Sequence, residues 1–249
     1  MSAGNPHKGH HRRFGLVGAL AASVLVLAMG AAPGSAEAGR VKVLGAAKSG
    51  PASCPEDCLV EARVTGFQAW IGKRKNPFRV PAHGRIVAWS IKLGNPAQAD
   101  RQFFNERFGA SQARISILKP IKIRNKRGRV VKTKYRLLRQ SPLQGLQPFF
   151  GTTTTFGLQR SLKVRKGNIV ALTMPTWAPA FSVAQPGRWR ASRVPSKKRG
   201  PCTTKKGFAN LNAGAAHMQK GTQRRYGCVY KGARLLYTAR FIRNAKRSG

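Results

Sequence analysis

The side chains that most often carry out catalysis are scarce in this chain. It has six Asp and Glu residues against 47 Lys and Arg residues, and neither Asp nor Glu occurs after Glu106. A glycosidase needs two carboxylates that flank one bond, and a Ser-His-Asp triad needs an acid to orient its histidine. Calcium and magnesium sites also draw on several oxygen ligands, usually with carboxylates among them. The scarcity of Asp and Glu therefore argues against a glycosidase, a Ser-His-Asp hydrolase and a calcium or magnesium site.

The remaining motifs give no better support for an enzyme. There is no GxSxG nucleophile elbow, no P-loop and no GxGxxG turn after a strand. His83 and His217 are far from every cysteine in the sequence, which disfavours a zinc site. Neither His83 nor Ser90 can be given a catalytic role. We expect a protein without catalytic residues, cofactor or metal, and hydrolytic turnover of a substrate panel would revive the enzyme alternative.

The four cysteines suggest structural cross-links. Cys54 and Cys58 flank a Pro-Glu-Asp turn, whereas Cys202 and Cys228 flank a polar segment. An even cysteine count in an exported chain is typical of disulfides, and four cysteines allow three connectivities. We expect Cys54–Cys58 and Cys202–Cys228, because each closes a local loop. The three residues inside CPEDC set it apart from the CxxC redox pair.

The first 38 residues have the order of a secretory signal. A basic start that ends at Arg13 precedes the uncharged apolar run 15–32, and Ala36 and Ala38 offer small residues to a signal peptidase. We expect cleavage before Gly39. The alternative is a retained anchor, although this run is short and weakly hydrophobic against the roughly 20 apolar residues of a spanning helix. The cleaved chain should be secreted, extracellular or associated with the cell envelope, with no integral membrane segment.

Positive charge is the main functional signal of the sequence. The net charge is +41, and removal of the three cations and one Glu of residues 1–38 leaves +39. So many charges cannot all be paired or buried, and the surface must be basic. Such a surface attracts nucleic acid, acidic polysaccharide, cell-wall polymers such as teichoic acids, or anionic lipid head groups. The alternative is a general surface charge that serves no ligand.

One alternating segment that leads into a basic loop is the predicted polyanion-binding site. In GRWRASRV, residues 187–194, two arginines lie on the face opposite Trp189. Contacts to phosphate or sulfate groups there would give affinity with little recognition of the polymer's own sequence. The expected partner is an anionic polysaccharide, a cell-wall polymer or extracellular nucleic acid. The predicted contact residues are Arg188, Arg190, Arg193, Lys197, Lys198 and Arg199.

A carbohydrate-binding platform is the main alternative. Sandwich and jelly-roll folds often host lectin sites, and such a platform needs an exposed aromatic ring. Among Trp70, Trp89, Trp177 and Trp189, the candidate is Trp177, because PTWAP suggests a Pro-rich loop. Trp89 lies among alternating core positions, and most tryptophans are core residues. A structural surface protein with no ligand is a further alternative.

The elements that would position these residues are mostly strands. Period-two alternation predicts strands, NKRGR predicts a hairpin turn at 125–129, and 95–110 is expected to be irregular, with no convincing amphipathic helix. We expect an all-β protein: a single antiparallel β-sandwich or jelly-roll-like domain of eight or nine strands. The strand segments are 58–70, 84–94, 113–124, 130–140, 152–165, 169–174, 187–194 and 232–242.

The stretch SLKVRKGNIVALTMPTW, residues 161–177, shows the expected interior of this sandwich. Its first half alternates, Gly167 supplies a turn, and 169–174 is wholly apolar up to Pro175. A fully apolar strand of this length is typical of a central strand covered on both faces. The domain should span 54–243, with the loop 202–228 closed by a disulfide. A flexible segment at 39–53 should precede it, and a basic tail at 244–249 should follow.

Several segments carry a resemblance in order and spacing from about Cys58 to Phe241. They are GRIVAWSIKLG, ARISILKP, YRLLRQSP, FFGTTTTFGLQRSLKVRKGNIVALTMPTWAPAF, WRASR and YGCVYKGARLLYTARF. The chain resembles a group of uncharacterised secreted β-sandwich proteins of actinobacteria. The resemblance implies a secreted sandwich and implies no activity. An acidic residue often follows the KG turn in that group, whereas this chain has Asn168, which disfavours a shared carboxylate site.

Overall fold

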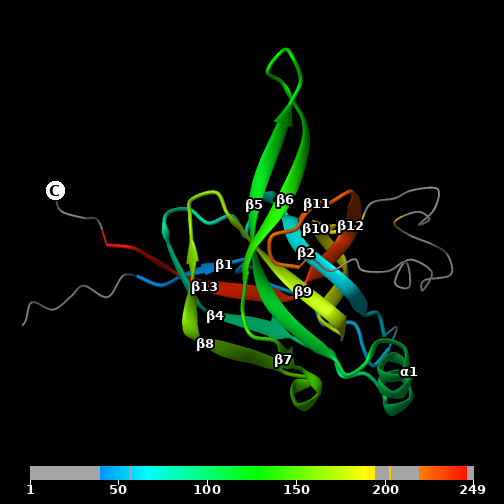
Figure 1. The fold of residues 1–249 in the computed structure, drawn as a ribbon. Coiled ribbons are helices and arrows are strands. Elements are labelled where there is room, and N and C mark those ends of the chain that lie inside the picture. The colour runs from blue at the N-terminus through cyan, green and yellow to red at the C-terminus, as the bar shows by residue number, and fades with distance from the viewer. Residues whose placement is uncertain (1–39, 57, 194–201, 203–218, 246–249) are drawn as a thin grey trace, which may run out of the picture. The chain divides into compact units, whose positions relative to one another are not determined.

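Two antiparallel sheets form the sandwich in the computed structural model, which describes residues 40–56, 58–193, 202 and 219–245 (Figure 1). The four-stranded sheet has the order β1 (Lys42–Leu44), β13 (Tyr237–Arg243), β4 (Gly84–Lys92) and β8 (Thr153–Val164). The main path of the nine-stranded sheet is β11 (Gln223–Arg225), β6 (Val130–Gln140), β5 (Gln112–Arg124), β9 (Ile169–Ala178), β2 (Glu61–Ile71), β10 (Phe181–Ala191) and β12 (Cys228–Leu235). Two short strands lie off this path: β3 (Arg74–Lys75) pairs with β2, and β7 (Gln144–Gly145) with β5.

The all-β class and the sandwich are therefore confirmed. Nine of the strands have seven or more residues, as expected, and the four short ones, β1, β3, β7 and β11, bring the described total to thirteen. The segment 39–53, expected to be flexible, contributes β1. Both predicted disulfides, Cys54–Cys58 and Cys202–Cys228, are formed. The predicted signal peptide and the last four residues of the predicted tail lie outside the described residues.

Strand β9 is the central strand that its composition predicts. It lies between β5 and β2, and its first six residues are all buried. It does not end at Pro175, however, but continues to Ala178. The ladder to β2 is irregular between Ala62 and Val64, where Arg63 has φ 47°. This bulge lets the strand pass a proline that has no N–H to donate.

The turn between β8 and β9, which leads from one sheet to the other, is held by Asn168. Its side-chain oxygen accepts a hydrogen bond from the backbone N–H of Arg165 at 2.9 Å, and its own N–H donates to the carbonyl of Arg165 at 3.0 Å. Gly167 has φ 87° and donates to the carbonyl of Val80 at 2.9 Å. The amide of Asn168 thus closes this turn, and Gly167 fixes it against the preceding loop.

Two local expectations are wrong. Residues expected to be irregular contain the helix α1 (Gln98–Phe108), whose Phe104 and Phe108 lie four positions apart and are buried. This spacing puts both rings on one face of a helix. The predicted strand 232–242 is two strands, β12 and β13, divided at Leu236, so that the chain passes from one sheet to the other. A short 3-10 helix, η1 (Gln147–Phe149), completes the described elements.

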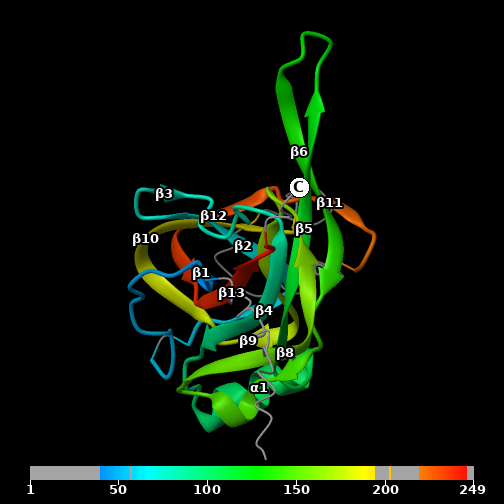
Figure 2. The same ribbon diagram turned by 90° about the vertical axis from the view of Figure 1, so that its left-hand side faces the viewer.

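The paired ends of β5 and β6 extend beyond the body of the sandwich as a two-stranded ribbon, seen in both views (Figures 1 and 2). The turn at its tip confirms the prediction from NKRGR. The side-chain oxygen of Asn125 accepts hydrogen bonds from the N–H groups of Arg127 at 3.1 Å and Arg129 at 3.0 Å. Gly128 adopts φ 70°, which a glycine allows without strain. Residues 124–131 are all exposed.

Candidate polyanion-binding surface

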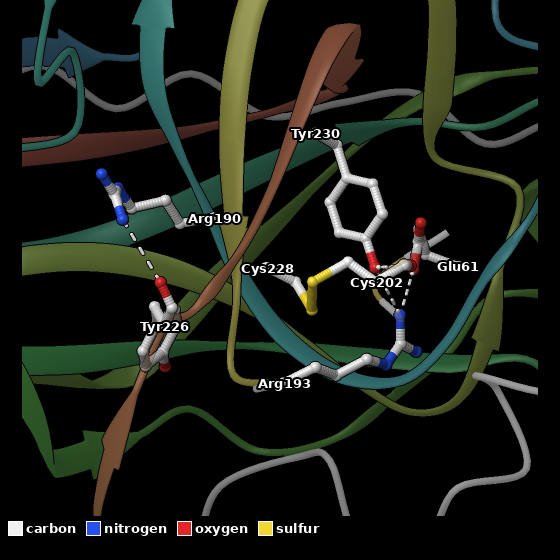
Figure 3. Close-up of a disulfide and its surroundings, with 7 residues drawn as sticks. All are labelled: Glu61, Arg190, Arg193, Cys202, Tyr226, Cys228 and Tyr230. Carbon is white, nitrogen blue, oxygen red and sulfur yellow. Dashed lines mark hydrogen bonds and ion pairs between the residues drawn. A yellow bond between two sulfur atoms is a disulfide. The ribbon is translucent and has the colours of Figure 1, made fainter. Parts of the chain in front are cut away.

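The predicted patch on β10 is only partly available to a ligand. Arg188 and Arg190 lie opposite the buried Trp189, as expected. Arg188 is exposed, whereas Arg190 is half-buried and donates a hydrogen bond to the carbonyl of Tyr226 at 3.3 Å (Figure 3). The other predicted members beyond Arg193, namely Lys197, Lys198 and Arg199, lie outside the described residues.

Arg193 is not a surface cation, and its assignment to the patch is wrong. It is 7% exposed, and its Nη1 lies 3.2 Å from Oε2 of Glu61 (Figure 3). The guanidinium also donates to the hydroxyl of Tyr230 at 3.4 Å and to the carbonyl of Ala62. Burial raises the pKa of the Glu61 carboxyl, and the charge of Arg193 opposes this rise. Arg193 therefore joins the segment after β10 to the start of β2.

Trp177 cannot serve as a carbohydrate platform, because it is fully buried. Its indole N–H donates to the carbonyl of Gly109 at 2.9 Å and to the side chain of Asn105 at 3.2 Å. Its ring packs against Phe104 and Phe150, with centroids 5.0 and 5.5 Å away. The presumed loop around it belongs to β9 and is covered by α1. The carbohydrate hypothesis thereby loses the residue on which it rested.

A different basic surface lies at the foot of the ribbon. Two hollows of about 480 and 410 Å³ adjoin there and share Arg139 and Arg165 in their walls. Every cation that lines them is exposed, and their lining includes no Asp or Glu among the described residues. We call this surface the cationic groove, and its cations are Arg79, Arg85, Lys119, Lys122, Arg139, Lys163, Arg165 and Lys166.

Distant parts of the chain build the cationic groove. Strand β8 and its turn supply three cations, β5 and β6 supply three more, and the segment from Arg79 to Arg85 supplies two. In β8, Leu162 and Val164 are buried, so the alternation sends Lys163 outward. Asn168 fixes the turn that carries the next two cations. Arg85 donates to the hydroxyl of Ser161 at 2.7 Å, which restrains its guanidinium.

The ribbon above the groove is unusually rich in positive charge. It holds no acidic residue, and some of its cations face each other directly: Lys119 pairs with Arg136 across the hairpin, and Lys134 pairs with Arg225 of β11. Like charges directly opposite on neighbouring strands are destabilising, so an anionic ligand would relieve this repulsion. The cations of residues 119–139 are Lys119, Lys122, Arg124, Lys126, Arg127, Arg129, Lys132, Lys134, Arg136 and Arg139.

The groove was not predicted from the sequence, although part of its signal was present. The runs KVRKG and IKIRNKRGR concentrate cations around two predicted turns. That the β8–β9 turn lies beside the foot of the ribbon, together with Arg79 and Arg85, depends on the pairing of β5 with β9 and of β4 with β8. Pairing between strands that are distant in the sequence leaves no pattern in either segment alone.

Three further observations bear on function. Within the described residues, no group of three or more His, Cys, Asp or Glu side chains is placed to hold a metal ion. None of the helices in the described ranges has the length and apolar character needed to cross a membrane. Comparisons with protein-family models, with curated proteins and with solved structures find no match for this chain.

Proposed function

We propose that this chain is a secreted, non-catalytic protein that binds anionic polymers through the cationic groove. The observation that carries the proposal is the gathering of eight exposed cations around Arg139 and Arg165 without a carboxylate in the lining. Lys and Arg that neutralise a polyanion release its counterions, and this release supplies most of the non-specific affinity. Two disulfides and the signal-like first 38 residues support a place outside the cell.

A polymer fits this surface better than a small anion does. The two hollows are joined through shared residues, and the cations continue onto the ribbon. All eight groove cations are exposed, whereas a site for one small anion usually encloses it with buried, fixed donors. A row of exposed cations matches a ligand that carries many charges along its length. Such a ligand stays bound even when single contacts move.

The test is a double substitution at the centre of the groove. Arg139→Gln with Arg165→Gln removes two cations, and Arg160→Gln with Arg240→Gln removes two exposed cations of the four-stranded sheet that do not line the groove, as the matched control. Binding of inorganic polyphosphate and of labelled oligonucleotides would be measured at several salt concentrations. With a slope of roughly 0.7 per single-strand phosphate contact, loss of two contacts should lower the slope by about 1.4. At 0.1 M salt this amounts to about a 25-fold loss of affinity.

The control pair should change affinity much less, since its charges act only at long range through a screening salt solution. If both pairs weakened binding equally, the charge would act as a general surface property. The cationic groove would then have no special part in binding, and the proposal would be refuted. Binding that did not respond to salt would contradict it as well.

A further inference from the structure

A second groove, of about 490 Å³, combines aromatic rings with cations. It lies where β6 and β11 meet β2 and β10, and the described residues that line it include no Asp or Glu. Its lining brings the ribbon strand β6 and the short strand β11 next to Arg190, which shares its face of β10 with Arg188. We call it the aromatic groove, and the residues that matter here are Phe67, Trp70, Tyr135, Tyr226, Lys132, Arg190 and Arg225.

Trp70 sets this groove apart from the rest of the surface. It is 36% exposed, whereas Trp89, Trp177 and Trp189 are fully buried. Cations of the two neighbouring strands lie over its ring: Nζ of Lys75 is 4.9 Å and Cζ of Arg188 is 5.5 Å from the ring centroid, so that a base would stack there in place of one of them. An exposed tryptophan flanked by cations offers a flat apolar surface beside charges of the sign that a polyanion needs.

Strand register extends this arrangement into a row across the sheet. Trp70 pairs with Lys75 of β3 on one side and with Arg188 of β10 on the other, and Arg188 pairs with Lys231 of β12. Directly paired residues point to the same face, and neighbouring strands lie about 4.8 Å apart. One ring and three exposed cations therefore follow each other over four strands.

The floor of the aromatic groove is rigid. The rings of Phe67, Tyr135 and Tyr226 contact one another, with centroids 4.8 to 5.3 Å apart. Burial raises the pKa of Tyr135, and the charges of Arg190 and Arg79 oppose the rise. Arg79, which lines the cationic groove, is thus within electrostatic range of Tyr135 in the aromatic groove.

We propose that the aromatic groove binds single-stranded nucleic acid, with a base stacked on Trp70 and the neighbouring phosphates held by Arg190, Arg225 and Lys132. This inference rests on the proposed function, because it names the polymer that the basic surface takes. Proteins that bind single strands combine a positive groove with aromatic side chains on which bases stack. Stacking is tolerant of sequence because every base has a flat face.

The hydrogen-bonding groups favour nucleic acid over polysaccharide. Lys and Arg only donate, and phosphate oxygens only accept. The hydroxyl groups of a polysaccharide also donate hydrogen bonds and therefore need acceptors in the protein. Among the described residues that line the groove, the side chains that can accept are the tyrosine hydroxyls, Asn76 and Thr133. Duplex DNA keeps its bases paired inside the helix, so that none can reach Trp70. The proposal therefore predicts a preference for single strands.

The test compares a thymidine oligonucleotide with an abasic oligonucleotide of the same length and charge. Stacking of one base on an aromatic ring should make the thymidine strand bind about 5-fold to 150-fold more tightly. It should also quench tryptophan fluorescence, because Trp70 is the exposed tryptophan of the four. Trp70→Ala should remove the preference and the quenching, whereas Trp70→Phe should keep part of the preference. Phe103→Ala, which removes an exposed aromatic ring on α1, is the control.

Equal affinity of the unmodified protein for the two strands would overturn the inference without any substitution. A preference that survived Trp70→Ala would overturn the assignment to this ring. In either case the salt-dependent binding of polyphosphate and its loss in the Arg139/Arg165 double variant would remain, so that failure here is distinct from failure of the proposed function. Preference for a sulfated polysaccharide over both strands would also count against nucleic acid.

Discussion

Substitution of Arg193 should destabilise the fold and leave polyanion binding unchanged. Arg193→Met keeps the length of the side chain and removes its charge and its hydrogen bonds to Glu61, Tyr230 and Ala62. The carboxylate of Glu61, whose side chain is 12% exposed, would then be left without its partner. Breaking a buried ion pair from one side costs about 3–5 kcal/mol. At roughly 2–4 °C per kcal/mol, the melting temperature should fall by about 6–20 °C.

The loss of stability in Arg193→Met should depend on pH in a defined direction. Burial already raises the pKa of Glu61, and removing the opposing charge of Arg193 raises it further in the folded state. A raised folded-state pKa favours folding below the unfolded value of 4.5, and this contribution is lost as the pH rises toward the folded value. The deficit of Arg193→Met relative to the unmodified protein should therefore be largest at neutral pH and should shrink toward pH 4.

Urea unfolding of the oxidised protein, followed by the fluorescence of the buried tryptophans, measures this deficit without added salt. Arg188→Met on the exposed face of β10 is the matched control, and it should stay within about 0.5 kcal/mol of the unmodified protein. Glu61→Gln should cost less than Arg193→Met, because the amide oxygen of Gln can still accept the hydrogen bond from Arg193. Equal stability of the two arginine variants, or a deficit that did not shrink in acid, would refute the structural role of Arg193.

Two further stability predictions follow from the core and the cross-links. Replacing both Cys202 and Cys228 by serine should cost about 3–4 kcal/mol in urea unfolding, against about 2 kcal/mol for Cys54 and Cys58, because the loop is longer; the reverse order would contradict a loop-entropy origin. Thr173→Val should cost about 1–3 kcal/mol, because the buried Thr173 hydroxyl lies 2.9 Å from that of Thr65 and 2.6 Å from that of Ser116. Thr153→Val, at an exposed position of β8, should change the free energy of unfolding by less than about 0.5 kcal/mol. A loss as large as that of Thr173→Val would speak against the hydroxyl network.

The fold class follows from patterns that are local in sequence. Alternation predicted the β4 and β5 strands, an apolar run predicted central β9, and glycine with charged neighbours predicted the ribbon turn. Features that depend on a partner elsewhere were missed. Strand β9 passes Pro175 because β2 bulges at Arg63, and α1 forms where two phenylalanines can cover Trp177. Neither partner can be inferred from the segment alone.

At the candidate site, too, the features that depend on one strand were predicted and those that depend on distant residues were missed. Opposite faces for Arg188 and Trp189 follow from alternation within one strand, and the structure confirms them. Arg193 lies two residues beyond β10, and its burial depends on Glu61 at the start of β2. The cationic groove brings Arg139 of β6 next to Arg165 of the β8–β9 turn, which are far apart in the sequence. The resemblance to secreted proteins of actinobacteria and the location outside the cell remain predictions.

The position of β13 constrains the order in which the protein can fold. This strand lies between β1 and β4, so that Lys42 pairs with Phe241, while β12, separated from it by Leu236, forms an edge of the other sheet. Contacts between such distant residues pay a large loop-closure cost and are typical of slow-folding β proteins. The four-stranded sheet cannot assemble until β13 has been synthesised. Until then, β4 has β8 as its one partner in that sheet among the described strands.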